Sequence, residues 1–129
     1  MQRAGSHATI PDMMDDLSPG DRLLASMTLK SAFHDRHERR AYERSIEIAR
    51  RIVNEPAIIQ NADAFLERHM RYDAHQARYY VLWRSVLGLP AEAIARALLE
   101  DSDRGAELRG SAPVFVVIEP SYGEDAFAS

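Results

Sequence analysis

The chain of 129 residues contains no cysteine, which excludes disulfide bridges, cysteine-ligated zinc and a thiol nucleophile. It contains no apolar run of the roughly 18 residues that a membrane-spanning helix needs. Its first residues lack the apolar centre of a secretory signal. Together these absences predict a soluble cytoplasmic protein with no membrane association.

Lysine is nearly absent as well, because the 16 basic residues are fifteen Arg and the single Lys30. With 20 acidic residues the formal net charge is -4, which argues against an obligate DNA-binding protein, since neutralising phosphates requires a basic surface. The many Arg and Ala residues are typical of GC-rich coding. A content of 46% hydrophobic and 28% charged residues is that of a globular protein, and the length suits one domain.

Helical periodicity and helix start signals dominate the chain, so we predict an all-α protein, a compact bundle of five to six helices. Ser18 before Pro19, Asp35, Pro56, Asp73, Pro90 and Ser102 are the start signals. The predicted helices cover residues 18–33, 35–53, 56–72, 73–87, 90–99 and 102–109. Apolar residues cover most of the circumference of the segment 73–87, which favours a central position for that helix.

One segment near the C-terminus has a different character. Val114-Phe115-Val116-Val117-Ile118 lies between Pro113 and Pro120 and contains four β-branched residues, which is typical of an extended β-type segment. A lone strand needs hydrogen-bond partners: a second copy of the chain, the sheet of another protein, or its own helices together with water. We therefore divide the chain into a flexible tail (1–17), a helical bundle (18–110) and an extended C-terminal partner-binding tail (111–129).

Three other patterns carry possible chemistry. His34, His37 and Glu38 can share one helix face like metal ligands, but neighbouring Arg residues oppose a cation, so a solvated polar junction is favoured and no metal is expected. Arg68 and His75, six residues apart, resemble the Arg–His pair of a class of helical ribonucleases. We keep that enzyme as an alternative to a non-catalytic protein. No phosphate-binding loop or other cofactor motif occurs in the sequence, so no cofactor is expected.

Residues 90–109 also fit a helix-turn-helix arrangement, in which residues 102–109 would form the reading helix. The acidic residues of this stretch, Glu100, Asp101, Asp103 and Glu107, place negative charge where phosphates would lie. Two ordinary packed helices are therefore the favoured interpretation. A DNA-binding regulator remains an alternative that we do not favour. Trp83, Tyr79 and Tyr80 are expected in the core, with their polar atoms hydrogen-bonded at its rim.

A series of short elements extends over residues 44–118. It comprises Arg44-Ser45, Glu55-Pro56, Tyr79-x-x-x-Trp83, Asp101-Ser102 and the final element Leu108-Arg109-x-Ser111-x-Pro113-x-Phe115. This series resembles a group of small bacterial helical proteins that are antitoxins of toxin–antitoxin modules. The chain departs from their pattern at Gly110, where Gln is usual, and at Val114, which separates Pro113 from Phe115. The resemblance implies that the C-terminal tail engages a toxin.

We therefore expect a protein-binding regulator that occludes a protein partner, a toxin or another enzyme, through its C-terminal segment. A homo-oligomer is also compatible with the sequence. Arg109 is expected to pair with a carboxylate of the partner, and Phe115 to be the apolar anchor of the interface. Deletion of residues 112–129 is expected to leave the helical bundle folded. The predicted partner-binding residues are Leu108, Arg109, Ser111, Pro113, Val114, Phe115, Val117 and Ile118.

Overall fold

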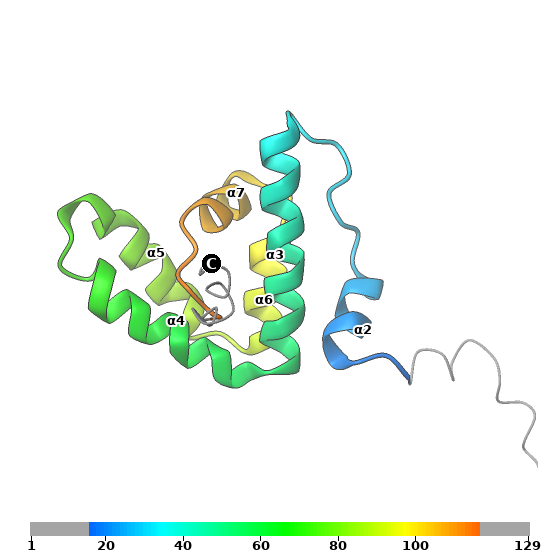
Figure 1. The fold of residues 1–129 in the computed structure, drawn as a ribbon, viewed down its shortest axis with the longest axis horizontal. Coiled ribbons are helices and arrows are strands. Elements are labelled where there is room, and N and C mark those ends of the chain that lie inside the picture. The colour runs from blue at the N-terminus through cyan, green and yellow to red at the C-terminus, as the bar shows by residue number, and fades with distance from the viewer. Residues whose placement is uncertain (1–15, 117–129) are drawn as a thin grey trace, which may run out of the picture.

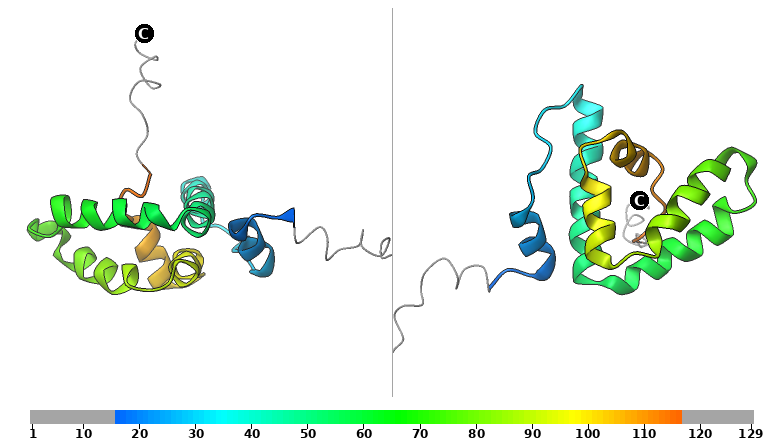
Figure 2. Two further views of the ribbon diagram at one scale, coloured as in Figure 1. Left: turned by 90° about the horizontal axis from the view of Figure 1, so that it is seen from below. Right: turned by 180° about the vertical axis from the view of Figure 1, so that it is seen from behind.

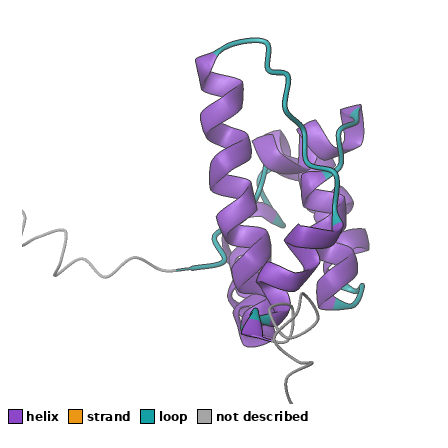
Figure 3. Cartoon of the chain, turned by 90° about the vertical axis from the view of Figure 1, so that its right-hand side faces the viewer, coloured by secondary structure: helices purple, strands orange, loops and turns teal. Residues whose placement is uncertain are grey.

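The computed structural model of the protein describes residues 16–116. Within this range the chain folds into six α-helices and has no strand, which confirms the predicted all-α class for the described residues (Figure 3). The predicted extended segment lies partly outside this range, because Val117 and Ile118 are not among the described residues.

The helices follow one another with short connections. The α-helices are α2 (Pro19–Ser26), α3 (Arg36–Asn54), α4 (Ile59–Phe65), α5 (Ala77–Leu87), α6 (Ala91–Leu99) and α7 (Asp103–Gly110). Single turns extend α4 and α5. The 3₁₀ turn η2 (Pro56–Ile58) precedes α4, and the π-helical turn η3 (Leu66–Met70) follows α4. The 3₁₀ turn η4 (Ala74–Gln76) precedes α5. No helix among residues 16–116 is long and apolar enough to cross a membrane.

Local capping sets several helix starts where the sequence predicts them. The side chains of Ser18, Asp35 and Ser102 accept hydrogen bonds from backbone N–H groups in the first turns of α2, α3 and α7. Asp73 caps η4 in the same way by accepting from the N–H of His75. These caps satisfy N–H groups that have no partner inside the helix.

Helix α2 ends earlier than predicted, at Ser26 rather than near Phe33. The hydroxyl of Ser26 donates to the carbonyl of Leu23, and the chain then runs extended along α3. There the N–H of Lys30 donates to the Tyr42 hydroxyl (3.1 Å), and the Phe33 and Tyr42 rings lie 5.6 Å apart. Tertiary contacts with α3 therefore replace the helical hydrogen bonds of this segment.

Helices α3 and α6 form the centre of the fold and lie side by side (Figures 1 and 2). Their contact faces contain fully buried small residues, Ala49 on α3 and Ala95 on α6, which permit close approach of the two backbones. The Tyr42 hydroxyl donates to the carbonyl of Leu99 at the end of α6 (2.7 Å). Ile52, Ile94 and Leu98 complete the interface, all with 0% exposure.

The prediction that residues 73–87 form the central helix is wrong. Helix α5 lies at the edge of the fold as one arm of a hairpin with α4 (Figure 1). It buries Trp83 and Val86, whereas Val81 on its outer side is 67% exposed. A nearly continuous apolar circumference does not show how many neighbours a helix has, and here the small residues of α3 and α6 determine the centre. The expected core position of Trp83 is confirmed at 0% exposure.

The helices form two layers, with α3 and α4 in one and α5, α6 and α7 in the other (Figure 2, left). After α7, residues 111–116 cross from the second layer toward the first and pass alongside α4 (Figure 2). This crossing segment contains Ser111, Pro113, Val114 and Phe115, half of the residues that the sequence assigns to partner binding.

Candidate protein-binding site

Helix α7 places the first two predicted site residues inside the fold. Leu108 is completely buried in the common core. Arg109 is half-buried, and its Nη1 donates to the carbonyls of Leu98 and Glu100, both at 2.9 Å. Its guanidinium also lies 4.8 Å from the ring of Tyr42. Arg109 therefore satisfies carbonyls at the end of α6 and stacks on an aromatic face, rather than pointing toward a partner's carboxylate.

Ser111 connects the end of α7 to the indole of α5. Its hydroxyl accepts a hydrogen bond from Nε1 of Trp83 (3.1 Å) and donates to the carbonyl of Glu107 (2.7 Å). The one polar atom of a fully buried Trp thus has a partner, as buried indole groups require. This pair fixes the direction in which the chain leaves the helical body.

The next residues alternate between the interior and the surface. Pro113 and Phe115 are buried, whereas Val114 is 41% exposed and Val116 is half-buried. An inward–outward alternation with a period of two is the geometry of an extended segment lying on a core. The described part, residues 112–116, thus lies across the chain's own helices, whereas the rest of the predicted strand lies outside the described residues.

Phe115 is the deepest contact of this segment, with 2% of its surface exposed. Its ring meets that of Trp83 edge-on, with the centroids 5.8 Å apart. Nδ2 of Asn61, on α4, donates to the Phe115 carbonyl at 2.8 Å. The expected interface anchor is therefore a core residue of this chain, and deletion from residue 112 would remove part of the core.

Two hollows open beside the crossing segment, and they share Phe65 and His69. The first, of about 390 Å³, is lined by Asn61, Ala64, Phe65, Arg68, His69 and Val114. The second, of about 280 Å³, is lined by Phe65, His69, Met70, Asp73, Gln76, Gly110, Ser111 and Ala112. Together they form a groove, which we call the tail groove, between the α4–η3 helix on one side and residues 110–114 on the other.

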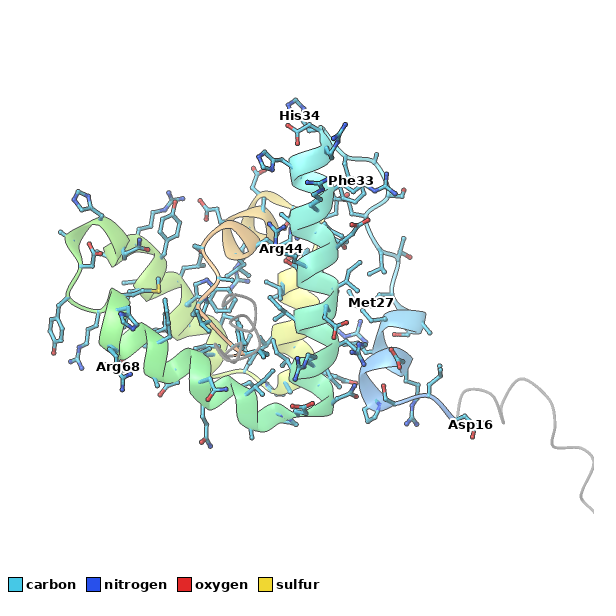
Figure 4. All side chains as sticks on the ribbon, in the orientation of Figure 1. Asp16, Met27, Phe33, His34, Arg44 and Arg68 are labelled. Carbon is cyan, nitrogen blue, oxygen red and sulfur yellow. The ribbon has the colours of Figure 1, made fainter. Side chains whose placement is uncertain are left out.

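Arg68 gives the tail groove a cationic border, and His69 lies beside it. Arg68 points outward from η3 (Figure 4) and makes no ion pair within residues 16–116. The His69 ring packs on that of Phe65, with the centroids 4.7 Å apart. The one acidic lining residue, Asp73, belongs to the second hollow and accepts from the backbone N–H of His75.

Ionic contacts hold the outer wall of the tail groove against α5. Arg84 pairs with Asp63 and, at 3.4 Å, with Glu67, which also accepts hydrogen bonds from the Tyr80 hydroxyl (2.7 Å) and Arg71 (2.8 Å). The Tyr80 hydrogen bond, followed by that of Arg71, lowers the pKa of Glu67 from its usual value, and the same contact raises the pKa of Tyr80. Glu67, Tyr80 and Arg84 are half-buried, so solvent still screens part of their contribution.

The structure separates the other residues with candidate chemistry. Arg68 lines the tail groove, whereas His75 lies in η4, and no contact between the two side chains occurs among the described residues. No group of three or more potential metal ligands occurs there either. Glu38 accepts from the N–H of His34 and Asp35 from the N–H of Glu38 (2.9 Å), so both carboxylates cap α3 near its tip (Figure 4). That cap lowers the pKa of Asp35.

The helix pair expected over residues 90–109 is present as α6 and α7, joined by three residues. Gly105 lies where α7 meets the end of α6, and a Cβ there would collide with the Glu100 carbonyl. Glu107 pairs with Arg78, and the exposed residues at the start of α7 include Asp103. The exposed surface of this pair is of mixed charge: its acidic residues are Glu92, Glu100, Asp101 and Asp103, and its basic residues are Arg96 and Arg104. It therefore lacks the basic surface that phosphate binding requires.

Asn61, Phe65, Arg68 and His69 are groove residues that the sequence did not connect with the C-terminal segment. Asn61 is 54 residues from its hydrogen-bond partner, and no sequence pattern signals that contact.

Comparison with known proteins adds no relationship: no protein-family model matches the chain, and neither a curated protein nor a solved structure matches it.

Proposed function

We propose that the protein is a protein-binding regulator that inhibits a partner by occlusion, in the manner of an antitoxin, through its C-terminal segment. The observation that supports this proposal is the exposed Val114 between two buried neighbours, Pro113 and Phe115. Both neighbours are fixed by the core, so Val114 is held outward in one extended conformation. A preorganised contact residue loses little conformational entropy on binding.

The residues of the element that resembles antitoxin tails then have two roles, attachment to the helices and contact with the partner. Leu108, Arg109, Ser111, Pro113 and Phe115 attach the segment to the helices. Val114, together with the apolar residues Val117 and Ile118 outside the described range, is then the part that we assign to the partner. Attachment residues of this kind act on the partner through the placement of Val114 rather than by touching it.

Occlusion is the mechanism that this arrangement serves. An extended apolar segment that leaves a rigid helical body can cover a catalytic cleft or a sheet edge while the body excludes larger ligands. The partner's contact surface is then expected to contain an apolar pocket for Val114. Apolar anchors in such pockets account for most of the binding free energy of an interface.

Co-expression with the protein encoded by the adjacent reading frame tests this proposal. We expect that protein to inhibit growth when produced alone and growth to recover when both are produced. The pair should form a complex whose dissociation constant is measurable by calorimetry. If the adjacent protein neither inhibits growth nor binds, the proposed function is wrong.

A matched pair of substitutions locates the binding surface. Val114→Asp should weaken the complex by about tenfold or more, because it places a charge in an apolar contact. Val81→Asp, on the exposed side of α5, should leave the dissociation constant unchanged. Both side chains are exposed, so neither substitution should shift the melting temperature of the free protein by more than a few degrees. Equal binding by the two variants would remove the C-terminal segment from the site.

A further inference from the structure

The crossing segment has an open backbone edge along the tail groove. Of the backbone groups of residues 112–116, only the Phe115 carbonyl makes a hydrogen bond with another described residue, Asn61. Backbone N–H and C=O groups in an extended segment are strong donors and acceptors, and they pair with any extended chain that lies beside them. Pro113 has no N–H and the Phe115 carbonyl is taken by Asn61, so the backbone groups of Ala112 and Val114 are those left beside the groove for strand addition.

The floor and rim of the first hollow define what such a chain would carry. Ala64, Phe65 and Val114 supply apolar surface, and the hollow of about 390 Å³ has room for one apolar side chain. Arg68 and His69 stand beside it; Arg68 supplies hydrogen-bond donors and positive charge, and His69 supplies an aromatic, polar ring. Arg68 is exposed and has no carboxylate partner within residues 16–116, whereas Glu67, on the same turn, is paired with Arg71 and Arg84.

We infer that the tail groove takes an extended, acidic segment of a partner protein, paired as a strand with the backbone of residues 112–114. An apolar side chain of that segment fills the hollow between Phe65 and Val114, and a carboxylate pairs with Arg68. This inference rests on the proposed function and specifies the partner's chemistry: a sheet edge or a loop with an apolar residue close to Asp or Glu. Main-chain pairing supplies affinity in this mode, and the side-chain hollow supplies specificity.

The position of Val114 determines where a paired strand would place its side chains. Val114 lies at the hollow, so a partner strand that pairs with its backbone places a side chain directly beside it. Asn61, on α4, donates to the Phe115 carbonyl and holds that end of the segment against α4, so a second chain can lie only beside residues 112–114.

The test uses the full chain and a synthetic probe. The probe is a capped peptide of alternating Val and Thr with one central Glu, and the comparison peptide has Lys in place of that Glu. We expect the acidic peptide to bind about fivefold more tightly, the size of one partly exposed ion pair. Binding should shift the nuclear magnetic resonance signals of the Val114 amide and the Asn61 side-chain amide. Equal affinity for the two peptides, or shifts elsewhere only, would overturn the inference.

Two variants and a control separate the groove from the fold. Arg68→Gln should abolish the preference for the acidic peptide, and Ala64→Trp should fill the hollow and prevent binding. Ala25→Trp, at an exposed position of α2, adds the same bulk away from the groove and should bind as the wild type does. All three positions are exposed, so the melting temperatures should remain similar. Peptide binding that survives Ala64→Trp would contradict the assignment.

Other occupants of the groove give different results, each of which overturns the inference. If the peptide binds only after residues 117–129 are deleted, the chain's own terminus fills the groove. If Ala64→Trp abolishes a concentration-dependent self-association, a second copy fills it. If the adjacent-frame protein binds wild type, Arg68→Gln and Ala64→Trp equally but not Val114→Asp, the proposed function stands and the groove assignment fails.

Discussion

The packing of Phe115 yields the sharpest stability prediction, because its neighbour Val114 provides a control one residue away. Phe115 is 2% exposed and contacts the fully buried Trp83, so Phe115→Ala removes a core aromatic ring. Such substitutions cost about 3–5 kcal/mol through lost burial and the cavity left behind. Val114→Ala, at a 41% exposed position, should change the free energy of unfolding by only about 0.5 kcal/mol.

Thermal unfolding followed by circular dichroism measures the difference. At roughly 5 °C per kcal/mol for a domain of this size, Phe115→Ala should lower the melting temperature by about 15–25 °C. Val114→Ala should melt within about 3 °C of the wild type. Urea unfolding should give the same order of stabilities. If Phe115→Ala has the same melting temperature as the wild type, the ring is not part of the core and the proposed attachment of the segment is refuted.

Three further predictions concern the helices that support the segment. Gly105→Ala should destabilise the protein by at least about 1–3 kcal/mol, because its Cβ would collide with the Glu100 carbonyl. Gly110→Ala, with open space around it, should leave the free energy of unfolding unchanged. Urea unfolding of both variants measures the difference. Tyr42→Phe should cost about 1–3 kcal/mol, since it leaves the buried Leu99 carbonyl without its donor; the same assay measures it. Glu67 has a lowered pKa in the folded state. The stability that its carboxylate contributes is therefore fully present above the usual glutamate pKa of 4.5, and it is lost as the pH falls through the lowered pKa. Glu67→Gln should therefore be less stable than the wild type near neutral pH and approach it in acid, and a constant difference across that range would contradict the contact with Tyr80.

Local signals account for what the sequence predicted well. Asp35 and Pro56 bracket α3, and Ser102 begins α7, because capping and proline geometry act within a few residues. The early end of α2 was not predictable in this way. It depends on the contact of Lys30 with Tyr42, which only the folded chain brings together.

For the site, too, contacts between neighbouring residues could be predicted from the sequence, whereas contacts between distant segments could not. The Leu-Arg-x-Ser-x-Pro-x-Phe element marks a segment with special packing, but its residue types do not show which side chains face inward. The structure shows that Phe115 faces Trp83 and that Val114 faces the groove. The Asn61 contact and the border formed by Arg68 come from a helix about 50 residues earlier, so no local pattern could reveal them.

We propose that the core holds the C-terminal segment so that Val114 faces a protein partner. Calorimetric titration of the adjacent-frame protein with the wild type, Val114→Asp and Val81→Asp measures what that placement contributes to binding. We expect Val114→Asp alone to lose about tenfold or more in affinity, while all three proteins melt at similar temperatures. Equal affinity for the three proteins would show that Val114 does not contact the partner.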